Sequence, residues 1–143
     1  MVSRILVPVD GSKYTEKSLE TACRIAQKFG AEITLLHIVV LPTPLPEMGR
    51  PPISIDTTVL EKTGREYLEK CKKTAEETGC RVATKLDFSL GNPGHVIVKV
   101  AKEQAYDVIV LGARGKSLVE NLLLGSVADT VTREAPCTVV VVR

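Results

Sequence analysis

The stretch from residue 112 to residue 126 carries the clearest capacity for binding chemistry. Gly112 and Gly115 follow the apolar run 108–111, and after nine further residues Gly125 and Ser126 precede a short helical pattern. Glycines permit positive φ and let a ligand approach the main chain, and a helix N-terminus offers unpaired, partly positive N–H groups. The order of strand, glycine-rich loop and helix start therefore suits the phosphates of a nucleotide.

This stretch has two other interpretations: a structural turn with a helix cap, which stays open, and a P-loop, which fails. The glycine pair alone is also typical of a tight turn between strand and helix, and Ser126 with Asp129 resembles a helix cap. Gly115-Lys116-Ser117 invites a comparison with the phosphate loop G-x-x-x-x-G-K-[ST]. In that frame the first glycine would fall on Val110, inside the strand, so the comparison fails.

Other polar residues fall where they could assist such a site. Asp10 follows the first strand and could accept hydrogen bonds from a ribose, or it could cap the next helix. Arg114 and Lys116 could neutralise phosphates or simply be solvated. The two histidines, at 37 and 95, have no serine or cysteine nucleophile at a related strand end, so we interpret both as structural and find no hydrolytic triad.

Short apolar runs alternate with helical patterns along the whole chain. This alternation predicts an α/β fold: a parallel sheet of five strands with right-handed crossovers and helices on both faces. Ligands bind such sheets beyond the carboxyl ends of the strands, where Asp10 and Gly112 fall. The expected strands are 5–9, 33–40, 82–88, 108–111 and 138–142, and the expected helices are 12–29, 57–78, one opening at 92–93, and 126–134.

One segment interrupts this alternation. Residues 41–56 hold five of the eight prolines, at positions 42, 44, 46, 51 and 52, which predicts an irregular, partly extended loop. Because the loop leaves the carboxyl end of the second strand, it could cover a ligand there. A surface excursion without that function is the alternative.

Composition limits the class of protein. The 143 residues fit one domain, and 44% hydrophobic with 25% charged residues predicts a folded chain. A net charge of +2 and only 3% aromatic residues argue against nucleic-acid binding. Four scattered cysteines predict free thiols in a reducing compartment. Because no membrane span or signal-peptide pattern is present, we expect a cytoplasmic protein without membrane contact.

Taken together, these features resemble the universal stress protein family in its ATP-binding branch. The nucleotide motif of that family is Gly, two residues, Gly, nine residues, Gly, then Ser or Thr, and 112–126 matches this spacing at every position. The opening residues 5–12, the strand at 35–38, the turn at 91–93 and the closing 136–142 are similar too. The resemblance spans residues 1–143 as one domain, with 41–56 as a variable loop.

The resemblance implies a Rossmann-like fold of strand order 3-2-1-4-5, similar to the adenine nucleotide alpha-hydrolases. It also implies ATP as the ligand, with or without Mg²⁺ or Mn²⁺, and no separate metal site. By that likeness Val9 and Ile38 frame the adenine with backbone groups, Asp10 and Gly112 hold the ribose, and the loop and last helix cradle the phosphates. The implied binding residues are Pro8, Val9, Asp10, Ile38, Gly112, Arg114, Gly115, Gly125, Ser126 and Val127.

The family also forms homodimers through its last strand. Residues 139–142 would leave an apolar strand edge uncovered, and antiparallel pairing with a second copy would cover it. The leading functional hypothesis is a nucleotide-sensing regulatory or stress-response protein with little hydrolysis. The nearby acids Asp10, Glu120 and Asp129 have no recognisable catalytic spacing. The alternatives are a slow ATPase with Asp10 holding a metal, and a nucleotide-free dimeric scaffold.

Overall fold

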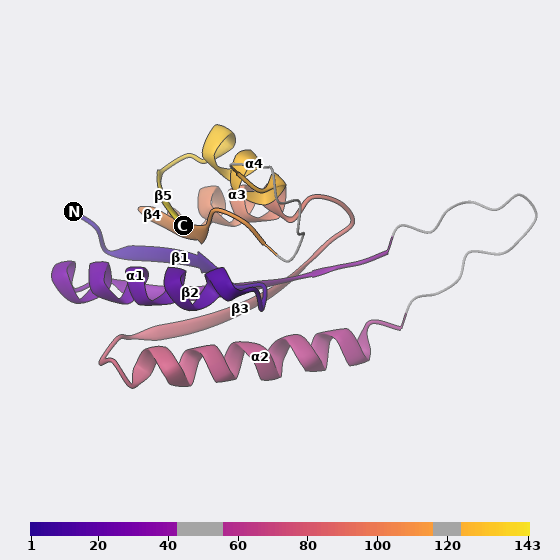
Figure 1. Ribbon diagram of the computed structural model, residues 1–143, viewed down its shortest axis with the longest axis horizontal. Coiled ribbons are helices and arrows are strands. Elements are labelled where there is room, and N and C mark those ends of the chain that lie inside the picture. Colours follow the sequence, from indigo (N-terminus) through magenta and orange to yellow (C-terminus); the bar gives the residue numbers. More distant parts are fainter. Residues whose placement is uncertain (43–55, 116–123) are drawn as a thin grey trace, which may run out of the picture.

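The protein is a single five-stranded parallel sheet with two helices on each face (Figure 1). The computed structural model describes residues 1–42, 56–115 and 124–143. The predicted alternation is confirmed, with boundaries within two residues of those expected. The elements are β1 (Arg4–Pro8), α1 (Lys13–Phe29), β2 (Glu32–Val40), α2 (Thr58–Glu76), β3 (Val82–Ser89), α3 (Pro93–Glu103), β4 (Val108–Gly112), α4 (Ser126–Glu134) and β5 (Thr138–Val142).

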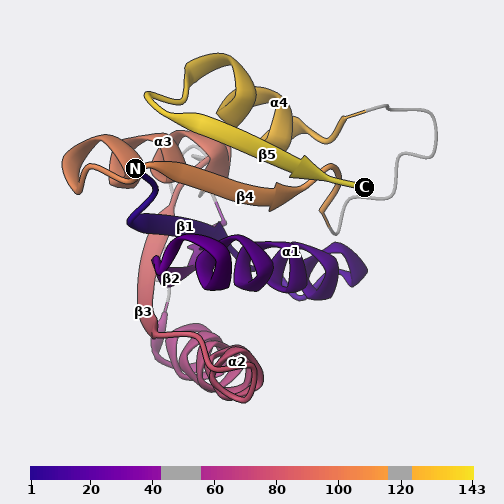
Figure 2. The ribbon, with the colours of Figure 1, turned by 90° about the vertical axis from the view of Figure 1, so that its left-hand side faces the viewer.

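The strands lie in the order β3-β2-β1-β4-β5, which confirms the predicted topology. β1 is central, pairing with β2 from Arg4↔Glu32 to Pro8↔Leu36 on one side and with β4 on the other. Chain order runs outward from β1 in both directions, as the fan of strands in Figure 2 shows. The strand order therefore reverses between β1 and β4, and ligands bind sheets of this kind beyond the carboxyl ends of the strands at such a point.

Alternating strand residues feed two separate hydrophobic cores. Ile5, Val7 and Val9 of the first strand region face α1 and α2, whereas Leu6 faces α3 and α4. Because β1 lies in the middle of the sheet, both of its faces are buried, which explains its nearly unbroken apolar sequence. The two helix layers fix the sheet from both sides and hold the strand ends in place.

Local signals set the helix ends as the sequence indicated. Gly30 and Gly79 adopt left-handed conformations, with φ of 70° and 87°, at the ends of α1 and of the turn after α2. The Asn92 side chain accepts a hydrogen bond from the Gly94 N–H at 2.8 Å and caps α3. Helix α2 ends at Glu76, two residues before the predicted end, and residues 77–79 form a turn.

Two predictions fall on residues outside the described ranges. These are the loop at 41–56, of which 43–55 are not described, and the loop residues from Lys116 to position 123, including Glu120. Within the described ranges, no helix combines the length and the apolar character needed to cross a membrane.

Candidate functional site

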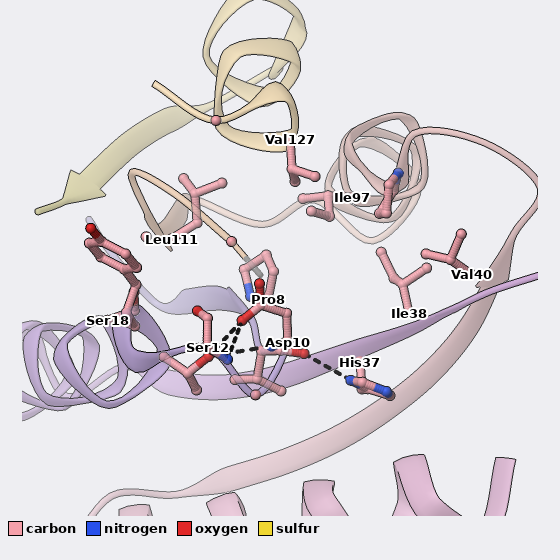
Figure 3. A pocket seen from close by; sticks show the side chains of 18 of the residues that line it. Pro8, Asp10, Ser12, Ser18, His37, Ile38, Val40, Ile97, Leu111 and Val127 are labelled. Carbon is pink, nitrogen blue, oxygen red and sulfur yellow. Dashed lines mark hydrogen bonds between the residues drawn. The ribbon is translucent and has the colours of Figure 1, made fainter. Parts of the chain in front are cut away.

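A cavity of about 800 Å³ opens at the carboxyl ends of β1, β2 and β4, where the strand order reverses (Figure 3). Its volume is within the range of small-molecule sites. The first turns of all four helices complete its wall. Every residue implied by the family resemblance lines it: Pro8, Val9, Asp10, Ile38, Gly112, Arg114, Gly115, Gly125, Ser126 and Val127.

Asp10 has one engaged and one open carboxylate oxygen. Oδ1 accepts hydrogen bonds from the Ser12 N–H at 2.9 Å and the Thr15 hydroxyl at 3.1 Å, so it stabilises the turn that leads into α1. Oδ2 receives no hydrogen bond from any residue in the described ranges. It points toward the glycine loop, where a Cβ on Gly115 would lie 2.8 Å from it. The interpretation of Asp10 as a turn residue is therefore confirmed for Oδ1, and its interpretation as a ribose acceptor stays a prediction for Oδ2.

The loop glycines allow neighbouring atoms to approach the backbone closely, and they do not adopt the positive φ angles that favour glycine. Among the described glycines, only Gly11, Gly30 and Gly79 have positive φ. A Cβ on Gly112 would lie 2.5 Å from the Tyr14 Cβ, so this glycine lets α1 pack against β4. A Cβ on Gly125 would lie 3.3 Å from the Ala113 carbonyl oxygen, to which the Gly125 N–H donates at 2.7 Å.

The N-terminus of α4 presents free donors to this cavity. The first hydrogen bond of the helix runs from the Asp129 N–H to the Gly125 carbonyl at 2.9 Å. The preceding N–H groups, those of residues 126–128, have no acceptor within the described part of the chain, and all three residues line the cavity. Such a helix start attracts anions.

The capping interpretation of Ser126 is wrong. Gly125 occupies the N-cap position and Ser126 is the first helical residue, with no side-chain cap bond. Asp129 instead pairs with Arg133 one turn later. The Ser126 hydroxyl is thus not committed to the helix end.

On the β2 side, Val9 and Ile38 both contribute to the cavity wall, but their backbone groups differ in their hydrogen bonds. The Val9 N–H donates to the Leu36 carbonyl at 2.9 Å. The Val9 carbonyl accepts from His37 Nδ1 at 2.9 Å, and a dashed line ends on this ring in Figure 3. The Val9 N–H and carbonyl are both engaged within the protein, which argues against the implied role of the Val9 backbone in framing an adenine and leaves only its apolar side chain to line the cavity. Ile38 lines the same wall, and its N–H has no hydrogen-bond partner among the described residues.

Three residues of the wall, His37, Gly64 and Tyr67, pack together although sequence reasoning did not single them out as site residues. The Tyr67 hydroxyl accepts a hydrogen bond from the Gly11 N–H at 2.9 Å, and its ring packs edge-on against His37 at 5.5 Å between centroids. Burial raises the pKa of Tyr67 to about 12, so the hydroxyl stays neutral. Gly64 lets the His37 ring reach α2, since a Cβ there would lie 2.8 Å from His37 Cδ2. Gly64 within a helical pattern was the only hint in the sequence.

The remaining charged and thiol groups have simpler environments. Arg114 lines the cavity and is half-buried, without an ion pair to any described residue. His95 lies outside the cavity, with Nδ1 3.1 Å from Glu134 Oε2. The four cysteines are free, and burial raises the pKa of Cys23 to about 11. In the described ranges, no three acidic, histidine or cysteine side chains cluster as metal ligands would.

The fold and the site define a doubly wound α/β domain with its ligand cavity at the topological switch point. The model of the universal stress protein family matches residues 1–143, and the chain therefore belongs to this family. A universal stress protein of Methanocaldococcus jannaschii, MJ0531, is 35% identical over 146 residues, covering 100% of this chain and 83% of the relative. Protein YxiE of Bacillus subtilis is 33% identical and is matched over the full length of both chains.

Solved structures show the same fold. A universal stress protein from Archaeoglobus fulgidus matches over 100% of both chains, with a TM-score of 0.76 and 27% identity. Two more distant structures share the fold. A universal stress protein in complex with cAMP has 23% identity and a TM-score of 0.74, covering 99% of this chain and 97% of the other. A universal stress protein from Archaeoglobus fulgidus in complex with dAMP has 22% identity and a TM-score of 0.69, covering 100% of this chain and 98% of the other.

Proposed function

We propose that this chain is a regulatory protein that binds an adenine nucleotide, foremost ATP, and holds it with little hydrolysis. The observation that carries the proposal is one juxtaposition. The free N–H groups at residues 126–128, the close-packed Gly115 and the open Oδ2 of Asp10 all face the same cavity.

The phosphates would lie at the start of α4. Three backbone N–H groups converge there, and the helix dipole adds partial positive charge. Arg114 stands on the same rim without a partner among the described residues, so it can supply a full positive charge. The Ser126 hydroxyl, free of a capping bond, adds a further donor.

The nucleoside would lie over the ends of β1 and β2. The open oxygen of Asp10 can accept hydrogen bonds from ribose hydroxyls, and Ile38 offers backbone groups to the base (Figure 3). Apolar side chains, including Leu111 and Ile97, line the deeper wall and suit the faces of a purine. The complexes of other family members with cAMP and dAMP support an adenine nucleotide in this fold.

Holding is favoured over turnover by the chemistry of the wall. Rapid phosphoryl transfer needs a group that orients the attacking water and groups that stabilise the developing charge. Asp10 is the one carboxylate among the described lining residues, and its Oδ1 already accepts two hydrogen bonds. It can act as a ribose acceptor without the second carboxylate that a magnesium-dependent ATPase commonly uses.

The test is a thermal shift assay with ATP, ADP, AMP and tripolyphosphate, together with mass spectrometry of whatever denaturation releases. Saturation at 100 times Kd contributes about 2.7 kcal/mol, which raises Tm by roughly 5 to 10 °C. Absence of a shift with every nucleotide would overturn the proposal in favour of a nucleotide-free scaffold. Phosphate release that follows the purified protein and is abolished by Asp10→Ala would favour a slow ATPase instead.

We also propose that two copies pair through β5. Among the strands in the described ranges this one pairs with β4 alone, so its outer edge faces away from the sheet, and residues 139–142 are only half-buried. Light scattering after size exclusion should give twice the 15.5 kDa chain mass. The Val142 carbonyl accepts from the Ala113 N–H on the β4 side, so the alternate residue Val141 turns its N–H to the outer edge. Val141→Pro removes that N–H and should shift the distribution toward monomer.

The compartment we propose is the cytoplasm. Its reducing conditions keep thiols free, and the four cysteines are free in the structure. Fractionation of cells that express a tagged chain would check this placement.

A further inference from the structure

The hydrogen-bond ladder between β1 and β2 stops one bond earlier than the strands would allow. Its last bond runs from the Val9 N–H to the Leu36 carbonyl at 2.9 Å, just after the final pair Pro8↔Leu36. In a continuing parallel ladder the Val9 carbonyl would next accept from the Ile38 N–H. That bond is not formed. The carbonyl accepts instead from the side chain of His37, whose Nδ1 is 2.9 Å away.

The alternation of β2 shows where the unused N–H points. The Ile33 N–H donates to Arg81 and the Leu41 N–H to Ser89, so odd-numbered residues turn their backbone groups toward β3. The Leu36 carbonyl faces β1. Ile38 therefore directs its N–H to the β1 side as well, beyond the point where the ladder ends. Ile38 lines the cavity at this place.

The imidazole of His37 is firmly held in the position that diverts the carbonyl. A carbonyl oxygen carries no proton, so the contact requires a proton on Nδ1. Tyr67 packs against the ring edge-on, and the missing side chain of Gly64 makes room for it against α2. The diversion is thus built into the packing of α2 on the sheet.

We propose that His37 is a positioning residue of the base subsite. Its Nδ1–H occupies the Val9 carbonyl, ends the ladder and so leaves the Ile38 N–H free to donate to a ring nitrogen of the nucleotide's base. The identity of the ligand rests on the proposed function. The freeing of the Ile38 N–H does not, and it can be measured without any ligand.

Amide hydrogen exchange followed by NMR tests the ladder directly. In the ligand-free protein the Ile38 amide should exchange at least about tenfold faster than the Val9 amide, which donates to Leu36. In His37→Leu the Val9 carbonyl becomes available, and the Ile38 amide should slow. In His37→Asn the side-chain amide nitrogen takes the place of Nδ1, so exchange should stay fast. A wild-type Ile38 amide as slow as that of Val9 would overturn the proposal.

Binding measurements test the consequence for the base. His37→Leu should weaken ATP binding about fivefold, the loss expected for one hydrogen bond, and leave tripolyphosphate binding unchanged. His37→Asn should restore the ATP affinity. Equal losses for both ligands would reduce His37 to a structural residue and overturn the proposal. If wild-type protein binds no nucleotide, the proposed function fails, while the exchange experiment still decides whether His37 frees the Ile38 amide.

Discussion

Asp10 Oδ2 and Gly115 share one corner of the cavity, so close that a Cβ on the glycine would lie 2.8 Å from the oxygen. That separation is shorter than a carbon and an oxygen tolerate without moving. The glycine therefore keeps the one open carboxylate oxygen accessible from the cavity, and the two positions should depend on each other in any ligand assay.

Replacement of Gly115 by alanine should remove nucleotide binding while leaving the fold intact. The new methyl group would displace the Asp10 carboxylate and narrow the phosphate end of the cavity. Gly91→Ala is the matched control, because a Cβ there meets nothing within 4 Å and its φ is not positive. Thermal shift with ATP should be lost in the first variant and kept in the second; an undiminished shift in Gly115→Ala would contradict this account of the loop.

Asp10→Asn separates the two oxygens of the carboxylate. The amide oxygen can still accept from Ser12 and Thr15, so Tm without nucleotide should change little. The second oxygen becomes a donor, and the loss of a charged acceptor should weaken ATP binding about tenfold to hundredfold. Calorimetric titration with ATP and with 2′,3′-dideoxy-ATP checks the cause. The substitution should weaken binding of ATP but not of the dideoxy analogue, because the analogue lacks the ribose hydroxyls. An equal loss for both nucleotides would show that Asp10 does not bind the ribose.

Gly64→Ala should destabilise the protein even though Gly64 lies inside a helix. Alanine normally gains about 1 kcal/mol over glycine at such positions. Here its Cβ would lie 2.8 Å from His37 Cδ2 and 2.9 Å from Leu86 Cδ1, so overpacking should cost about 1 to 3 kcal/mol. Urea unfolding measures the free-energy change, with Lys62→Ala on the exposed face of the same helix as control. A gain in stability would mean that α2 does not pack on His37 as described.

Asp107 should contribute to acid sensitivity. Its pKa is lowered, first by the hydrogen bond from the Ser3 N–H and then by those from the Arg4 N–H and the Ser3 hydroxyl. Because the folded pKa lies below the unfolded value of about 3.9, the stabilisation is complete above that pH and is lost as pH falls through the folded pKa. Denaturant unfolding from pH 6 to pH 2 should therefore show a shallower decline for Asp107→Asn than for wild type, and parallel curves would refute the contribution.

Much of the fold was predictable because its determinants are local. Gly30 ends α1 and Gly79 ends the turn after α2 by adopting left-handed angles, and Asn92 caps α3 through its own side chain. Strands that are buried on both faces have nearly continuous apolar sequences, and these runs made it possible to predict β1 and β4. The spacing of the glycines from 112 to 125 could likewise be read in the sequence, although their effect proved to be close packing and not positive φ.

What the sequence could not supply depends on contacts between distant segments. Ser126 and Asp129 have the spacing of a cap, but Gly125 occupies the N-cap position and Asp129 pairs with Arg133. Nothing near His37 in sequence indicates that its ring would take the Val9 carbonyl. That contact requires β1 beside β2 and α2 packed on β2, so only the assembled fold reveals it.

The wall of the cavity draws on residues from Pro8 to Ala128 and on the first turn of every helix. No partial assembly of the chain, for example β1 to α2 alone, has both the Asp10 corner and the free amides at 126–128. A nucleotide bound there is consequently held only by a completely folded domain, and its binding energy acts on the whole cooperative unit. Occupancy would thus report the integrity of the domain itself, so a partly unfolded copy would lose its ligand before it lost its remaining structure.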